Sequence, residues 1–243
     1  MQSALYVALS AQVALSNRLE TVSRNVANMN TAGYRADEVK FAELVSKAGQ
    51  DKVSFSTGGE KYISRQAGSL NKTDSPLDLA VEGDAWFAIR DVNGTVSYTR
   101  DGRLQITRDG TLQTLTGQTI LGTGGQAISL DPDAGPPLIS QSGEISQGDL
   151  GIVGQIGLFL IPNEAELTRK DNSAVVPDVP AIPVQVFDEN GIRQGYVEGA
   201  NINPVREMIK LIMISRAFEG ATKMIDASGE SQENAIKELG ATS

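Results

Sequence analysis

Carboxylates are the side chains of this sequence with the clearest capacity for chemistry. Asp78, Glu82 and Asp84 follow one another closely in a segment rich in β-forming residues. Two carboxylates at a suitable separation act as acid and base in glycoside hydrolysis, but a sequence does not give that separation. Surface charge at strand ends is the simpler interpretation, and we assign no catalytic residue.

Other reactive sites are disfavoured by residues that are missing. The 243 residues include no Cys and no His, which removes the usual ligands of zinc, copper and haem and rules out a Ser-His-Asp triad. Asp131 and Asp133 lack the ligand spacing of a calcium loop. The glycine-rich residues 122–125 lack the Lys-Ser or Lys-Thr of a phosphate-binding loop. The sequence therefore predicts no enzymatic activity, metal, cofactor or small-molecule substrate.

Charge and hydropathy narrow the possible partners. With 30 acidic and 21 basic residues the formal net charge is −9, which disfavours nucleic acid and anionic lipid as partners. No apolar run reaches the length of a membrane span, so we expect no direct membrane insertion. Residues 1–12 have no basic residue before an apolar run and no small-residue cleavage site, so we expect no cleaved signal peptide.

Both ends of the chain are predicted to be long helices. No Gly or Pro interrupts residues 1–32, and Gly33 is a suitable stop. At the other end Asn203 can cap a helix that begins at Pro204. Apolar residues recur in steps of three and four along both segments, a pattern typical of a coiled coil, and Gln12 is the one polar member of the first row. The candidate assembly interface consists of Leu5, Ala8, Gln12, Leu15, Leu19, Val22, Val26 and Met29, with Met208, Leu211, Ile214, Phe218, Ala221 and Ile225.

The two rows have more apolar surface than one helix pair covers. Six of the seven residues 208–214 are apolar, so this part needs partners on several sides. An alternative is that the helices cover the sheet of a single α+β domain. The narrowness of the rows favours helix pairing instead.

Short β-type runs and turn dipeptides fill the middle of the chain. Asn-Gly or Asp-Gly pairs at 93–94, 101–102, 109–110 and 190–191 favour hairpins, and TRDGRLQIT is followed by the near copy TRDGTLQTL. Trp86 lies in a strand-like run, where a core position is favoured over a ligand-binding one.

The predicted fold class is therefore α+β, mainly β. An antiparallel β-rich body (65–202) is flanked by terminal helices (1–34 and 203–240) that pair in an axial, coiled-coil-like domain. Residues 35–64 form a connector that begins with a helical continuation at Phe41, Leu44 and Val45.

Three separated segments resemble one protein family. Residues 23–35 (SRNVANMNTAGYR) place an Ala-Asn pair before a Thr-x-Gly-Tyr turn. Residues 67–122 include a Gly-x-Leu turn, SPLDLAVEGDAWFAI and YTRDG, and residues 194–225 include QGYVE, SRAFE and KMI. In these segments the chain resembles bacterial flagellar basal-body rod and hook proteins, most of all the proximal rod proteins. Residues 84–87 (DAWF) depart from the Gly-Phe-Phe usual in that family.

The resemblance implies a structural subunit of the rod, the drive shaft that transmits torque for motility. It implies assembly with copies of itself and other rod proteins, delivery by the flagellar type III export apparatus, and a place in the periplasmic span of the basal body. Two alternatives remain: a distal rod or hook protein of the same family, and a secreted β-rich carbohydrate-binding module or glycosidase.

Overall fold

The computed structural model describes residues 2–40, 43–46, 53–56, 60–171 and 173–241 of the chain. They form two compact units. The helical unit contains the described parts of 1–27, 37–62 and 203–243, and the β unit contains 28–36 and the described parts of 63–202. The predicted boundaries of an axial domain, a connector and a body remain a prediction.

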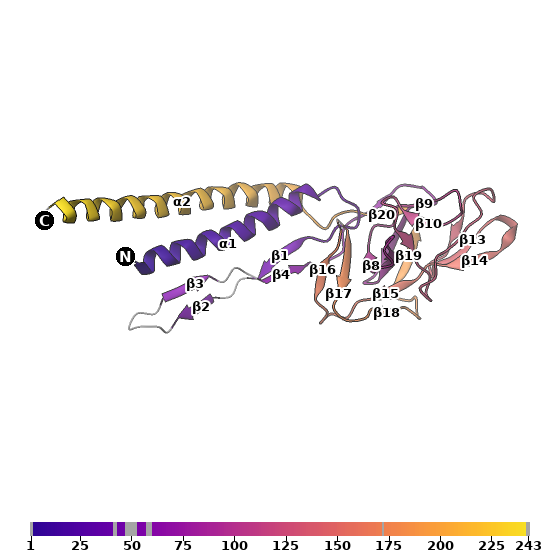
Figure 1. Ribbon diagram of the computed structural model, residues 1–243. Helices are drawn as coiled ribbons and strands as arrows, with labels where there is room; N and C mark the ends of the chain where they lie inside the picture. Colours follow the sequence, from indigo (N-terminus) through magenta and orange to yellow (C-terminus); the bar gives the residue numbers. More distant parts are fainter. Residues whose placement is uncertain (1, 41–42, 47–52, 57–59, 172, 242–243) are drawn as a thin grey trace. The chain divides into compact units, whose positions relative to one another are not determined.

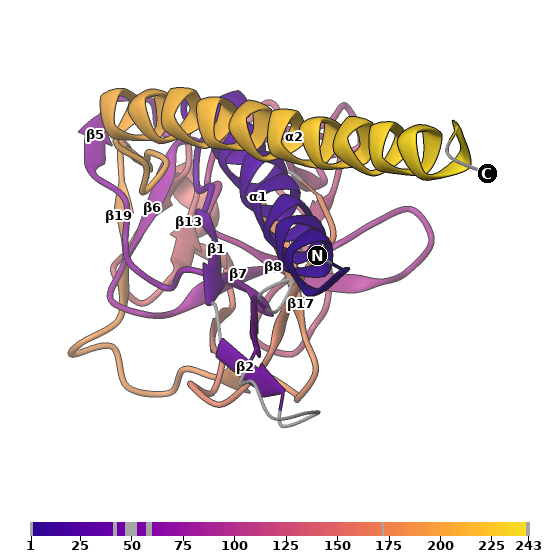
Figure 2. The same ribbon diagram turned by 90° about the vertical axis from the view of Figure 1, so that its left-hand side faces the viewer.

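Two terminal helices dominate the helical unit. Helix α1 (Gln2–Ala27) and helix α2 (Pro204–Ala241) contact each other and run antiparallel (Figure 1), and they are inclined to one another when seen along α1 (Figure 2). The Asn203 side chain accepts a hydrogen bond from the Arg206 amide at 3.1 Å, which confirms the predicted cap. Neither helix, over the residues described, has the length and apolar content that a membrane span requires.

Helix α1 is shorter than predicted. It ends at Ala27, and a turn follows in which the Thr31 amide donates to the Asn28 carbonyl at 3.0 Å. The Asn25 side chain donates to the Asp37 carbonyl and accepts from the Asp37 amide, both at 2.9 Å. Asn side chains that bond the backbone compete with helix continuation. Met29 therefore lies in the turn, outside the helical row.

Two pairs of short strands complete the helical unit. Strand β1 (Asp37–Lys40) pairs with β4 (Glu60–Ile63), and β2 (Glu43–Ser46) pairs antiparallel with β3 (Val53–Ser56). The prediction of a helical continuation was wrong, since Leu44 and Val45 lie in β2. Phe41 lies outside the described residues.

Antiparallel strands form the β unit, which confirms the predicted β body and the mainly β, α+β class. The main sheet follows the order β16-β17-β8-β7-β11-β10-β9, with β15 pairing β7 and β18. Its strands are β7 (Trp86–Arg90), β8 (Val96–Thr99), β9 (Leu104–Ile106), β10 (Leu112–Thr114), β11 (Thr119–Ile120), β15 (Leu158–Leu160), β16 (Leu167–Arg169), β17 (Ala174–Pro177) and β18 (Ile182–Pro183).

Smaller sheets surround the main one. Strand β19 pairs with β6, β20 pairs with β5, and β12, β13 and β14 form a three-stranded sheet. Their bounds are β5 (Leu70–Lys72), β6 (Leu79–Glu82), β12 (Leu138–Ile139), β13 (Glu144–Ser146), β14 (Ile152–Gln155), β19 (Gly191–Gln194) and β20 (Tyr196–Glu198), and a short 3₁₀ helix, η1 (Gly148–Leu150), precedes β14.

Strand β7 divides the interior of the β unit. Its side chains alternate between faces. Phe87 and Ile89 enter the larger apolar cluster, and Trp86 enters a smaller one with Val175 and Ile161. The predicted core position of Trp86 is thereby confirmed.

The four Asx-Gly dipeptides do not all form hairpins. Asn93-Gly94 joins β7 to β8, and Asp109-Gly110 joins β9 to β10, as predicted. Asp101-Gly102 instead connects β8 to β9, which do not pair with each other. Asn190-Gly191 lies at the start of β19, whose partner is β6, so it forms no hairpin turn either.

We expect Gly33 to tolerate no side chain. Its φ is +65°, and an added Cβ would lie 2.2 Å from the Asp101 amide nitrogen and 2.4 Å from the Arg100 carbonyl carbon. Gly117→Ala is the matched control, because its φ is +86° but no atom lies within 4 Å of the added Cβ. The control should lose about 1–2 kcal/mol from backbone strain, and Gly33→Ala about 2 kcal/mol more. Urea unfolding measures both, and equal losses would contradict the close contact.

Candidate functional site

Three charged side chains are buried together in the β unit. Arg35, Arg100 and Glu198 are 2%, 1% and 0% exposed. Arg35 Nη2 lies 2.8 Å from Glu198 Oε1, and Arg100 Nε lies 2.9 Å from Glu198 Oε2. One carboxylate thus lies between two guanidinium groups, and we call these three residues the ion cluster.

Each member of the ion cluster comes from a different part of the chain. Arg35 follows the Gly33 turn, Arg100 follows β8, and Glu198 ends β20. Glu198 Oε1 also accepts the Gly68 amide at 2.8 Å. Arg100 donates to the Gly83 carbonyl at 2.7 Å and to the Ala85 carbonyl. The cluster thereby ties together segments more than 150 residues apart in sequence.

Trp86 adds a second kind of contact to the ion cluster. The Arg35 and Arg100 guanidinium carbons lie 5.6 and 5.8 Å from its ring centroid. Such cation–π contacts contribute about 0.5–2 kcal/mol each, more when water is excluded. Tyr34 is stacked in the same way under Arg169, whose guanidinium carbon lies 4.3 Å above the ring.

The electrostatics of the ion cluster suit a structural role. Burial lowers the pKa of Arg35 to about 10, against the opposing effect of Glu198, so the group is charged at neutral pH. Burial likewise lowers the pKa of Arg100. Arg35 Nε and Nη1 have no hydrogen-bond partner among the described residues, and the Arg100–Glu198 contact is an ion pair without hydrogen-bond alignment. A guanidinium group that stays charged at neutral pH can hold chain segments together but does not exchange its proton there.

Backbone hydrogen bonds reinforce the ion cluster. The Gly33 amide donates to the Glu198 carbonyl at 2.8 Å, and the Asn201 amide donates to the Tyr34 carbonyl at 3.2 Å. Asn201 Oδ1 accepts the Ala36 amide at 2.7 Å. The segment that follows α1 in sequence is therefore fixed to the segment that precedes α2.

The sequence candidates for catalysis have other roles. Glu82 pairs with Arg193 at 2.8 Å, Asp84 is exposed, and Asp131 accepts the Asp133 amide at 2.9 Å within its own turn. Among the described residues, no three acidic side chains come together as a possible metal site. The Gly125 amide donates to the Gly122 carbonyl at 2.9 Å, which makes residues 122–125 an ordinary turn.

Most candidate interface residues lie on partly covered faces of the two helices. Those that are buried or half-buried are Ala8, Gln12, Leu15, Leu19, Val22 and Val26 in α1, and Leu211, Ile214, Phe218, Ala221 and Ile225 in α2. Met208 is exposed, and the side chain of Leu5 lies outside the described ones.

The polar member of the first row has a polar partner. Gln12 Nε2 donates to Thr222 Oγ1 at 3.2 Å, and Thr222 Oγ1 donates to the Phe218 carbonyl at 3.0 Å. A polar pair within an apolar helix contact favours one register over others. Sequence reasoning missed Thr222, because its neighbour Ala221 fits the apolar spacing.

A second set of apolar side chains on the two helices is exposed. It consists of Leu9 and Val13 in α1, and Val205, Met208, Ile209, Ile212, Met213 and Met224 in α2. We call it the outer face. Single exposed apolar residues are ordinary, but a concentration of them on one helix indicates an interaction surface.

Sequence reasoning also missed the ion cluster. Its residues occur in the matched segments as the Arg of GYR, the Arg of TRDG and the Glu of YVE. In β20, Val197 and Glu198 are consecutive residues of a short strand. Both are buried, so this strand is covered on both faces.

We expect Glu198→Gln to destabilise the β unit strongly. The change leaves two buried guanidinium groups without a counter-charge, and removing one partner of a buried pair costs about 3–5 kcal/mol. Glu82→Gln is the control, because it breaks a partly exposed pair with Arg193 and should cost less than about 1 kcal/mol. Thermal unfolding of the two variants gives the comparison. Similar losses in both would show that the ion cluster is not an anchor.

Comparisons with protein families agree with the sequence resemblance. Residues 5–35 match "Flagella basal body rod protein", residues 80–147 match "Flagellar hook protein FlgE/F/G D1 domain", and residues 193–238 match "Flagellar basal body rod FlgEFG protein C-terminal". Arg35 and Arg100 lie in the first two matched ranges, and Glu198 lies in the third.

Individual relatives narrow the assignment. The chain is 46% identical over 243 residues to the flagellar basal-body rod protein FlgF of Mesorhizobium japonicum, with all of both chains covered. It is 41% identical to FlgF of Rhizobium meliloti, with 99% of both covered. It is 28% identical to the rod protein FlgG of Agrobacterium fabrum, with 97% of this chain and 99% of the other covered. The chain therefore belongs to the flagellar basal-body rod protein family, within the group named FlgF.

Proposed function

We propose that the chain is a structural subunit of the proximal flagellar rod and assembles through α1 and α2 into the drive shaft that transmits torque. The observation that carries the proposal is the outer face of the helices. Ile212, for example, is 53% exposed although α1 covers other residues of the same helix. An apolar surface of this kind is stabilised when further helices pack against it.

The helix pair offers two different contacts for two different tasks. The inner contact, with Gln12 and Thr222, sets the register of α1 against α2 within one chain. The outer face is then available to neighbouring subunits, and closed or helical assemblies arise when such contacts repeat. We propose that α1 and α2 form the axial, coiled-coil-like part of the subunit.

The family name supports the choice of partners and place. We propose that the neighbours are copies of this chain and other rod proteins, in the periplasmic span of the basal body. Delivery by the flagellar type III export apparatus without a cleaved signal peptide is part of the same proposal. The higher identity to the two FlgF relatives than to the FlgG relative supports the proximal rod over the distal rod.

A catalytic role receives less support. Glu82 pairs with Arg193, Asp84 is exposed, and the Arg35 guanidinium, whose pKa burial lowers to about 10, is charged at neutral pH. We propose a purely structural role, in which the ion cluster holds segments of the β unit together when force acts on the subunit.

Leu15→Asp tests the inner contact. Leu15 is half-buried in the helical unit, and a carboxylate there should cost about 2 kcal/mol or more. We expect helix content in far-ultraviolet circular dichroism to fall and swimming to be lost, with the fluorescence of Trp86 unchanged. The neighbouring Ser16→Asp is the control, because Ser16 is exposed. Normal swimming of the Leu15 variant would contradict an assembly role for this row.

Ile212→Asp tests the outer face separately. Because Ile212 is exposed in the single chain, the purified variant should keep its helix content and unfolding temperature. Rod assembly should nevertheless fail, which electron microscopy of basal bodies detects. Ser231→Asp places the same charge at an exposed polar position of α2 and should assemble normally. Intact rods built from the Ile212 variant would exclude this face as a subunit contact.

A further inference from the structure

The three-stranded sheet of β12, β13 and β14 has a row on its outward face that is mostly apolar. Leu138 lies opposite Ser146, and Ser146 lies opposite Ile152, so the three side chains form one row across the sheet. Leu138 and Ile152 are 71% and 69% exposed. The neighbouring residues Ile139 and Ile145 occupy the other face and belong to the core.

This arrangement departs from the usual pattern of such a sheet. An antiparallel sheet with one buried face normally presents polar residues on the other. Here the outward row has only Ser146 between two large aliphatic side chains, and Leu150 in the adjoining η1 is exposed as well. We call the surface formed by Leu138, Ser146, Leu150 and Ile152 the distal face.

The chain segment that contains the distal face carries charge of one sign. Residues 109–168 contain seven Asp or Glu and no Lys or Arg. Glu144 lies two residues from Ser146 on β13 and shares its face, and Asp149 precedes Leu150. Neither carboxylate has a basic partner within the residues that the structure describes.

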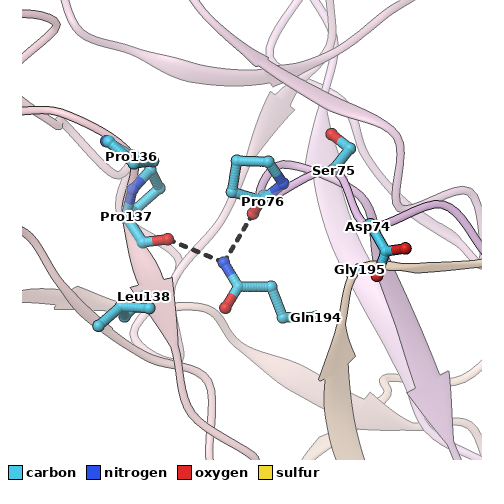
Figure 3. A pocket seen from close by; sticks show the side chains of 8 residues that line it. All are labelled: Asp74, Ser75, Pro76, Pro136, Pro137, Leu138, Gln194 and Gly195. Atoms are coloured by element: carbon cyan, nitrogen blue, oxygen red, sulfur yellow. Dashed lines mark hydrogen bonds between the residues drawn. The ribbon is translucent and has the colours of Figure 1, made fainter.

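A pocket of about 330 Å³ adjoins the distal face at Leu138. Figure 3 shows Pro136, Pro137 and Leu138 on one side and Asp74, Ser75 and Pro76 on the other. Between them, Gln194 Nε2 donates to the Pro76 and Pro137 carbonyls, both at 2.8 Å (Figure 3). These bonds hold the two sides in place.

The shape and chemistry of the pocket suit a long basic side chain. Proline rings and Leu138 can cover the aliphatic stem of a Lys or Arg, whose charged end prefers water or a carboxylate. The exposed Asp74 supplies that carboxylate at the rim, where it is paired with the exposed Lys72 at 2.8 Å.

We propose that the distal face and its pocket dock another protein, one that presents apolar side chains next to Lys or Arg. A second copy of the same face is disfavoured, because it would bring the same unpaired carboxylates into contact. The site belongs to the β unit and involves neither α1 nor α2, so it does not depend on the proposed rod function.

Site-specific photo-crosslinking in cells that assemble flagella tests the proposal. The photoreactive residue p-benzoylphenylalanine replaces Ile152, and in a control strain it replaces Val92, which is exposed in the β7–β8 turn. We expect Ile152 to crosslink one other protein, through a peptide that contains Lys or Arg. Crosslinking no stronger than at Val92, or only to another copy of the chain, would overturn the proposal.

Charge reversal distinguishes specific docking from capture of a bystander. Glu144→Lys with Asp149→Lys should reduce the Ile152 crosslink by about tenfold, because like charges then face the basic partner. Glu164→Lys with Glu166→Lys is the control, since both residues are exposed near β16 and the net charge changes equally. Unchanged unfolding temperatures establish that all variants are folded. An equal crosslink in the two double variants would also refute the proposal.

Discussion

A single buried carboxylate, that of Glu198, is the interaction on which the β unit depends most. Two guanidinium groups face it, and the indole of Trp86 covers both of them. Buried ion pairs contribute little net stability over apolar packing, but they are costly to leave incomplete. The β unit is therefore stable only when the cluster is complete. Burying Arg35, Arg100 or Glu198 without its partners would leave an unpaired charge. This requirement holds the segment that follows α1 in sequence against the segment that precedes α2.

The helical unit differs from the β unit in how completely its apolar side chains are covered. Its two helices bury one face against each other and leave further apolar side chains in water. A stable single chain would cover that surface, whereas an assembling subunit gains stability when neighbours cover it. The β unit has a buried core, whereas the helical unit leaves apolar side chains exposed. This difference agrees with membership of a family of rod proteins.

Basic residues are unevenly distributed along the chain. The stretch from 109 to 168 has no basic residue, whereas α2 carries Lys or Arg along much of its length. Carboxylates without partners keep a surface soluble and repel copies of the same surface. The distal face therefore combines apolar side chains with a barrier against self-association, which favours a different protein as its partner.

The sequence by itself determined the elements whose signal is local. Capping by Asn203, the apolar rows and the hairpin at Asn93-Gly94 depend on near neighbours, and family membership followed from short motifs. The two TRDG segments show what the sequence alone did not determine. The second is a hairpin turn with Arg108 exposed, and the first buries Arg100 beside Glu198 and has Gly102 where a Cβ would lie 1.9 Å from the Leu79 carbonyl. Identical residues took different structures because their partners lie far away in the chain. Only the tertiary structure decided which Arg is buried, where α1 ends, and which apolar side chains remain in water.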